Sequence, residues 1–173
     1  MDLIAEYNKQ LERQKHITGV AMKVFNKFHG GLLESAYECA LKYLLEKDGY
    51  KVEEQKELPM YWDNVKLEKT YRMDMVVDDN IIIELKAIKF VTDEHRKQLR
   101  NYMNLTHTQW GMLINFSMDR VYSEWYKRVD GEIERVKLMW CWLLCMESFK
   151  NLNENLYEEI ISGWSPKIME IDF

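Results

Sequence analysis

Two carboxylates and one ammonium group stand at a spacing that suits metal-assisted chemistry. Asp74 precedes Glu84 by ten residues, and Lys86 follows Glu84 by two. Carboxylate oxygens are the ligands that hard divalent ions such as Mg²⁺ prefer, and a lysine beside them can stabilise charge that develops on a phosphorus atom. A surface hairpin on which Lys86 merely neutralises Glu84 is the simpler alternative.

A short hairpin explains how Asp74 and Glu84 would meet. The three residues after Val77 are typical of a hairpin loop, in which we expect the last residue, Asn80, to take the left-handed conformation. Val77 then opposes Ile81, and Asp74 lies directly opposite Glu84. Like charges in opposite positions destabilise a sheet, so this register favours a cation between them.

The same register sorts the hairpin into two faces, because side chains alternate along a strand. One face is expected to hold Arg72, Asp74, Val76, Ile82, Glu84 and Lys86. The other face, wholly apolar and therefore core, is expected to hold Met73, Met75, Val77, Ile81, Ile83 and Leu85.

Two helical segments carry residues suited to the same chemistry. Glu34 lies near the start of an expected helix, with Tyr37 one turn later, although an acid at a helix N-terminus is also stabilised by the helix dipole alone. A later helix carries Arg96, Lys97 and Arg100. Cations beside a carboxylate pair are what a phosphodiester substrate requires. The alternative for this helix is a solvated charged face.

The elements that would position these residues follow from apolar periodicity and turn residues. Helices are expected over Leu3–Phe28, ended by Gly30 and Gly31, over Leu32–Lys47, and from Thr92 or Asp93 to Leu105. Strands are expected over Lys51–Trp62, Val65–Val77, Ile81–Ile88, Gln109–Phe116 and Val121–Val129. The order α-α-β-β-β-α-β-β predicts an α/β (α+β) domain with a mixed sheet flanked by helices. Its strand–helix–strand unit predicts that the Ile81 and Gln109 strands are parallel neighbours.

Beyond Gly131 the pattern weakens. We assign residues 1–131 to one domain and residues 132–173 to a C-terminal extension packed on it. The extension would contain a strand within Glu132–Trp140 and one or two helices within Trp142–Ser162. Its apolar character makes it a candidate contact between copies of the chain.

Composition limits the class of protein. The chain has 173 residues, of which 47% are hydrophobic and 31% charged, and only two are proline, as in one globular domain. The net charge of −5 disfavours a protein that coats nucleic acid without specificity. Three cysteines without a C-x-x-C pair indicate reduced thiols and a cytoplasmic protein. We expect no signal peptide and no membrane span, since the longest apolar run has nine residues.

The order of several short motifs resembles the GxxExxY protein family, a branch of the PD-(D/E)xK nuclease superfamily. The motif of the family name corresponds to Gly31-Leu32-Leu33-Glu34-Ser35-Ala36-Tyr37. The match continues through Gln55, Tyr71-Arg72-Met73-Asp74, Ile83-Glu84-Leu85-Lys86, His95, Gln98-Leu99, Tyr102 and Gly111-Met112-Leu113-Ile114-Asn115-Phe116. Met73 departs from the superfamily pattern, which has a proline there, but that proline is no metal ligand.

The resemblance implies a restriction-endonuclease-like fold and a set of site residues. Asp74, Glu84 and the carbonyl of Leu85 would bind Mg²⁺ or Mn²⁺. Glu34 would complete the metal site, Lys86 would be the superfamily's lysine, and Gln98 would line the pocket. Tyr37 and Gln55 match the family pattern without an assigned chemical role. Substrate contacts are expected from Tyr37, Gln55, Arg72, Arg96, Lys97, Arg100 and Tyr102.

The sequence thus predicts a divalent-metal-dependent nuclease that hydrolyses phosphodiester bonds in DNA or RNA. The first rival is a catalytically silent domain of the same fold that binds nucleic acid or a protein partner. The second is a structural homo-oligomer built on the apolar extension.

Overall fold

The computed structural model describes residues 3–136, with side chains from Lys9 onward. The chain divides between Arg135 and Val136 into two units, and the first holds all the elements named below. The helices expected within residues 142–162 and the expected contact between copies lie outside the described residues, as do residues 137–140 of the strand expected within residues 132–140.

Three helices follow the predicted periodicity: α1 (Leu3–Phe28), α2 (Glu34–Lys47) and α3 (Asp93–Thr106). At the end of α1, His29 takes the left-handed conformation (φ 59°) that we expected of a glycine. Gly30 is required for a different reason, because a Cβ there would collide with the backbone of Ser117 and Met118. Within the described residues, no helix is both long and apolar enough to cross a membrane.

Six strands form one mixed sheet in the order of the chain. They are β1 (Val52–Trp62), β2 (Val65–Val77), β3 (Ile81–Lys86), β4 (Trp110–Phe116), β5 (Val121–Val129) and β6 (Glu132–Arg135). Strands β3 and β4 are parallel, as predicted, and the other neighbours are antiparallel. The predicted α+β class with a mixed sheet is confirmed. Strand β6 pairs with β5, so the sheet continues past the domain boundary we placed at Gly131.

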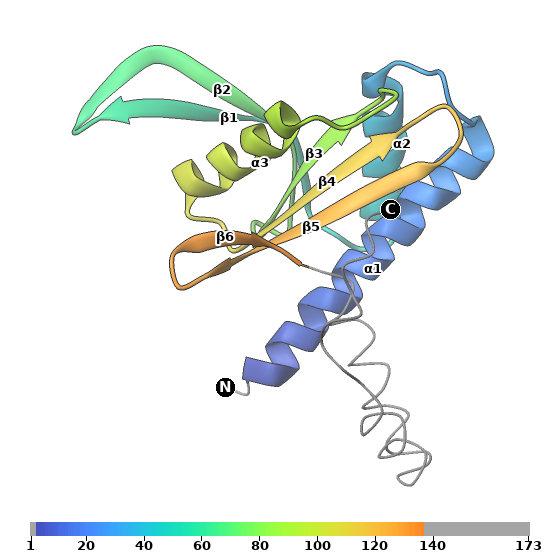
Figure 1. The fold of residues 1–173 in the computed structure, drawn as a ribbon, viewed down its shortest axis with the longest axis horizontal. Coiled ribbons are helices and arrows are strands. Elements are labelled where there is room, and N and C mark those ends of the chain that lie inside the picture. Colours follow the sequence, from blue (N-terminus) through green and yellow to red (C-terminus); the bar gives the residue numbers. More distant parts are fainter. Residues whose placement is uncertain (1–2, 137–173) are drawn as a thin grey trace, which may run out of the picture. The chain divides into compact units, whose positions relative to one another are not determined.

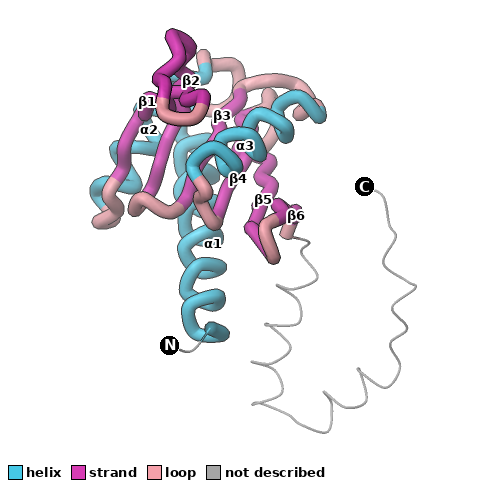
Figure 2. Tube along the Cα trace, turned by 90° about the vertical axis from the view of Figure 1, so that its left-hand side faces the viewer, coloured by secondary structure: helices cyan, strands magenta, loops and turns pink. Residues whose placement is uncertain are grey.

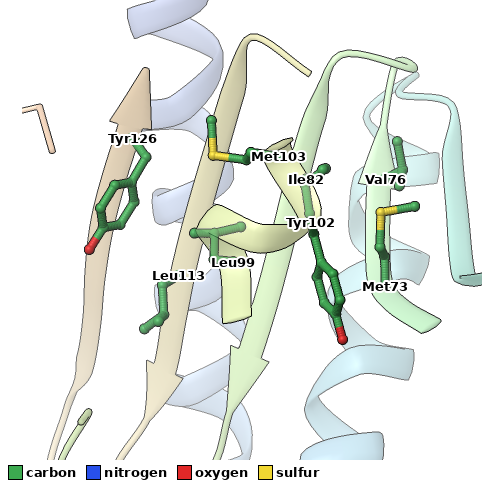
Figure 3. Packing of buried hydrophobic residues seen from close by; sticks show 8 residues of the cluster. All are labelled: Met73, Val76, Ile82, Leu99, Tyr102, Met103, Leu113 and Tyr126. Atoms are coloured by element: carbon green, nitrogen blue, oxygen red, sulfur yellow. The ribbon is translucent and has the colours of Figure 1, made fainter. Parts of the chain in front are cut away.

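Helices cover both faces of the sheet (Figures 1 and 2). Figure 3 shows α3 in front of the strands and α1 and α2 behind them. A buried cluster joins α3 to the sheet and consists of Met73, Val76, Ile82, Leu99, Tyr102, Met103, Leu113 and Tyr126. The helix packs close to β4 because Gly111 has no side chain; a Cβ there would lie 2.5 Å from the sulfur of Met103.

The β2–β3 hairpin has the predicted register as far as its pairing extends. Val77 pairs with Ile81, and the ladder continues to Met75 with Ile83. It ends one residue before Asp74, so the expected backbone pair of Asp74 with Glu84 is not formed. The hairpin loop therefore brings the two carboxylates to the same place, at the point where β2 and β3 stop pairing.

Two local expectations for this hairpin were wrong. Asp78 (φ 48°) and Asp79 (φ 56°), not Asn80, take the left-handed conformation, which aspartate tolerates better than most residues. Met73 packs on the α3 face instead of the opposite one. Strict alternation fails beside Asp74, where the facing residue of β1, Gln55, itself has a positive φ of 50°.

Candidate functional site

Three carboxylates converge on the ammonium group of Lys86. Its Nζ lies 2.5 Å from Glu84 Oε1, 3.9 Å from Glu34 Oε1 and 4.0 Å from Asp74 Oδ2. It also donates a hydrogen bond to the carbonyl of Leu85 at 2.8 Å. These are the residues that the sequence placed at a metal site, and they come from α2, β2 and β3.

Asp74 stands where the β2–β3 ladder ends. Its Oδ2 accepts a hydrogen bond from the backbone N–H of Leu85 at 2.8 Å. The side chain thus takes the place of the main-chain acceptor that a longer β2–β3 ladder would provide. Burial raises the pKa of Asp74, and the hydrogen bond from Leu85 and the charge of Lys86 oppose that rise. The carboxylate is thus fixed in orientation and poorly solvated.

Glu84 is fully buried. Burial, and after it the charge of Asp74, raises the pKa of Glu84 to about 7, although the hydrogen bond to Lys86 opposes the rise. Its second oxygen, Oε2, is buried without a hydrogen-bond partner, which is costly for a group that carries charge. This oxygen needs either a proton or a cation.

Glu34 reaches the site from the first turn of α2. Its side chain is 41% exposed. Burial is the largest effect on the carboxyl and raises its pKa; Lys86 opposes that rise and Asp74 adds to it. Glu34 is the most accessible of the three acids to solvent.

Tyr37 fixes the backbone that leads into α2. Its hydroxyl donates to the carbonyl of His29 at 2.6 Å and accepts from the N–H of Leu32 at 3.1 Å. The ring is fully buried and stacks on Phe116, with centroids 4.3 Å apart. We expected a substrate contact, but the structure gives Tyr37 a positioning role: it anchors the segment that presents Glu34.

A fourth acid, Glu38, adjoins this site, and we did not predict it from the sequence. It is buried one turn after Glu34, and its Oε1 accepts a hydrogen bond from Gln55 Nε2 at 2.6 Å. Burial raises the pKa of Glu38, Gln55 lowers it, and Asp74 raises it further. Its position four residues after Glu34 on the same helix face was the available signal. Gln55 thus binds a protein carboxylate, and no substrate contact is assigned to it.

The α3 side of the site is formed by Gln98 and Tyr102. Gln98 Nε2 donates to the hydroxyl of Tyr102 at 3.1 Å. Burial raises the pKa of Tyr102, and the charges of Glu84 and Asp74 add to the rise. In Figure 3 the Tyr102 hydroxyl points toward the carboxyl end of β3, where Glu84 and Lys86 stand. Tyr102 thus faces the carboxylate cluster, and Gln98 is bonded to its hydroxyl; the pocket role of Gln98 and the substrate contact of Tyr102 stay predictions.

Two predicted phosphate contacts are engaged elsewhere. Arg96 binds the buried carboxylate of Glu124, with Nη2 to Oε1 at 2.8 Å. The Arg100 guanidinium lies 5.4 Å from the centre of the Tyr126 ring. Both partners come from β5, far from α3 in the sequence, so these contacts were not predictable from α3 alone, and the phosphate contacts stay predictions. Lys97 is exposed on α3.

Arg72, another expected substrate contact, lies on the β1–β2 hairpin. Its side chain is 61% exposed, 3.9 Å from Glu57. The structure does not bring it into the carboxylate cluster.

The residues present fit a hard divalent cation. Within the described residues, no three His, Cys, Asp or Glu side chains are gathered closely enough to hold a metal ion as they stand. In this structure the ammonium of Lys86 lies among the three carboxylates. The donor set nevertheless consists of carboxylate oxygens and the Leu85 carbonyl, which suit Mg²⁺ or Mn²⁺. The unpartnered Glu84 Oε2 provides an oxygen that a cation would satisfy.

Comparison with known proteins agrees with this geometry. A family model described as the PD-(D/E)XK nuclease superfamily matches residues 11–129, most of the described chain. No curated protein sequence matches the chain. One solved structure, titled "Crystal structure of SSO0001", is 20% identical over 53% of this chain and 48% of its own, with a TM-score of 0.40. The match thus spans about half the length of that structure.

Proposed function

Because the chain belongs to the PD-(D/E)XK nuclease superfamily, we propose that it is a divalent-metal-dependent nuclease that hydrolyses phosphodiester bonds in DNA or RNA. One observation carries the proposal: Glu34, Asp74 and Glu84 all lie within 4.0 Å of Lys86 Nζ. The superfamily relation suggests a nucleic-acid substrate, and this cluster supplies the groups for its hydrolysis.

The proposed division of labour follows from the donors. Asp74, Glu84 and the carbonyl of Leu85 would hold Mg²⁺ or Mn²⁺, and Glu34 would bind through water or a second ion. A bound divalent ion lowers the pKa of a coordinated water and polarises a phosphoryl oxygen.

Lys86 would orient the attacking water or stabilise the charge that develops on phosphorus. To do so it has to leave its present place among the carboxylates. Gln98, held by the Tyr102 hydroxyl, would position the substrate.

We also propose membership of the GxxExxY branch and a cytoplasmic location. The branch assignment is supported by the contacts of its motif residues: Glu34 faces Lys86, and Tyr37 anchors the preceding backbone. The location is supported by Cys39, the cysteine within the described residues, whose thiol is exposed and free, as expected in a reducing compartment.

The decisive experiment is a cleavage panel. Labelled single- and double-stranded DNA and RNA are incubated with wild type, Lys86→Ala and Lys23→Ala in Mg²⁺, Mn²⁺ or chelator. Lys23 is an exposed lysine of α1 and serves as the matched control. We expect metal-dependent cleavage by wild type and Lys23→Ala, and none by Lys86→Ala. Cleavage that survives in Lys86→Ala would falsify the assignment.

A thermal-shift titration separates an active from a silent site. Mg²⁺ should raise the melting temperature of wild type but not of Asp74→Asn, because Asp74 is a proposed ligand. A metal-dependent shift without cleavage of any probe would support the silent binding domain instead.

A further inference from the structure

A groove of about 630 Å³ lies between the β1–β2 hairpin and α3. In Figure 1 this hairpin extends away from the rest of the sheet, and α3 runs below it. Its lining includes Met60 and Tyr71 from the hairpin, and Gln98, Asn101, Tyr102 and Leu105 from α3. Of these, Gln98 was expected to line a pocket and Tyr102 to contact substrate, whereas Met60, Tyr71, Asn101 and Leu105 were not predicted from the sequence.

The groove offers aromatic and apolar surface with amides beside it. The rings of Tyr71 and Tyr102 are 6.0 Å apart between centroids, at 59° to each other. Gln98 and Asn101 contribute amide groups, which donate and accept hydrogen bonds. Such a lining suits a flat ring that carries hydrogen-bond donors and acceptors on its edge, and an unstacked nucleobase is a ring of this kind.

The charges of the groove do not suit a phosphate. Among the described residues that line it, Lys97 is offset by Glu94, so this lining carries no net charge. A phosphate group would need net positive charge, whereas a base is uncharged. The lining therefore favours the base of a nucleotide over its backbone.

Tyr102 is shared by the lining of the groove and the α3 side of the carboxylate cluster. The ring of Tyr102 lines the groove, and its hydroxyl points toward the carboxyl end of β3 (Figure 3). Gln98 contacts that hydroxyl at 3.1 Å and lines the groove as well. The groove therefore lies on the Tyr102 side of the carboxylate cluster, where it is available to a base of a strand bound at that cluster.

We propose that this groove binds an unpaired nucleobase of the substrate strand, so that the protein prefers single-stranded nucleic acid, or unpaired positions, over regular duplex. The proposal rests on the proposed nuclease function and specifies its substrate. Bases inside a duplex are stacked and paired, and only an extruded or single-stranded base can enter a pocket of this kind.

The test measures binding without cleavage. Fluorescence anisotropy in chelator compares four labelled probes with the full chain: single-stranded DNA, single-stranded RNA, a DNA duplex of the same sequence, and a single strand of the same length with abasic sites. We expect the abasic strand and the duplex to bind at least about tenfold more weakly than the single strands, since each base stacked on an aromatic ring contributes to affinity.

Two variants connect this preference to the groove. Tyr71→Ala should weaken single-strand binding roughly tenfold, and Asn101→Ala should weaken it by a smaller factor. Both should leave duplex binding unchanged. Tyr43→Ala and Asn26→Ala are the matched controls, since both residues are exposed on the helices of the opposite face. The exposed Asn101 keeps the test valid if Tyr71→Ala is poorly folded by circular dichroism.

The results separate this proposal from the nuclease function. Equal binding of abasic and intact strands, or wild-type binding by both groove variants, would overturn the groove even if metal-dependent cleavage is found. Base-dependent binding that both variants weaken supports the groove even if no probe is cleaved, and the nuclease proposal alone would then fail.

Discussion

Replacing Glu84 with glutamine should make the metal-free protein less sensitive to pH. Glu84 is fully buried, and its pKa is raised to about 7. Glutamine keeps nearly the same shape and cannot ionise. The change therefore removes one titration from the folded protein and leaves the packing of β3 in place.

The magnitude follows from linkage between protonation and folding. The rise from the ordinary 4.5 to about 7 corresponds to about 3 kcal/mol, at roughly 1.4 kcal/mol for each pKa unit. Because the folded pKa is the higher one, the unfolded chain loses this proton first as pH rises. The free energy of unfolding of wild type should therefore fall between pH 4.5 and about 7 and level off above that.

The assay is urea unfolding in chelator at a series of pH values for wild type, Glu84→Gln and Glu46→Gln. Glu46 is an exposed carboxylate of α2 and serves as the control. Between pH 4.5 and 7.5, wild type should lose about 3 kcal/mol relative to Glu84→Gln, and Glu46→Gln should follow wild type. Parallel curves for wild type and Glu84→Gln over this range would refute the burial argument.

Three further substitutions test separate parts of the structure. Lys86→Met should abolish cleavage yet retain the Mg²⁺-dependent rise in melting temperature, because an ammonium is no metal ligand; loss of both would contradict its role. Tyr37→Phe should lower the free energy of unfolding by about 1–2 kcal/mol in urea, since the carbonyl of His29 loses a partly buried hydrogen bond. Glu124→Ala should cost about 3–5 kcal/mol in the same assay, because it leaves Arg96 without its buried partner; a cost below 1 kcal/mol would show that solvent replaces the pair.

Local sequence signals were sufficient for most of the fold. The apolar spacing over Leu3–Phe28 corresponds to one helix, and the β-branched residues from Ile81 form the central strand. The hairpin register was predictable because a loop of three residues makes Val77 and Ile81 the first pair of the ladder, and that pair sets the others. That register brought Asp74 and Glu84 to one place.

Contacts between distant residues could not be derived in this way. Arg96 has the positive charge expected of a phosphate contact, but its guanidinium binds Glu124, which lies 28 residues later in the chain. Tyr37 had a polar hydroxyl, but two backbone groups of the α1–α2 connection use it. In both cases the side-chain type was read correctly and its partner was set by tertiary packing.

The prediction of which sheet face Met73 occupies failed for a related reason. Alternation along β2 assumes regular extended backbone, whereas Asp74 bonds the N–H of Leu85 with its side chain and Gln55 opposite has a positive φ. An irregular strand at the position of the acid is a tertiary feature. No periodic pattern in the sequence reports it.

A proton and a metal ion should compete for Glu84. In the metal-free protein its Oε2 lacks a partner, and its pKa is about 7, so below that pH a proton on Glu84 and the ammonium of Lys86 together offset two of the three carboxylate charges. Binding of Mg²⁺ through Glu84 has to expel that proton. As pH increases toward 7, the apparent affinity for Mg²⁺ should therefore increase by up to about tenfold for each pH unit, and above pH 7 it should level off.

Isothermal titration calorimetry in buffers of different ionisation enthalpy measures both the affinity and the number of protons released. Glu84→Gln should show no such release and should bind Mg²⁺ weakly at every pH. An affinity for wild type that is flat between pH 5.5 and 8 would mean that the ion binds without Glu84. The cation would then have to be held by Asp74 and Glu34 alone, and Lys86 could stay paired with Glu84.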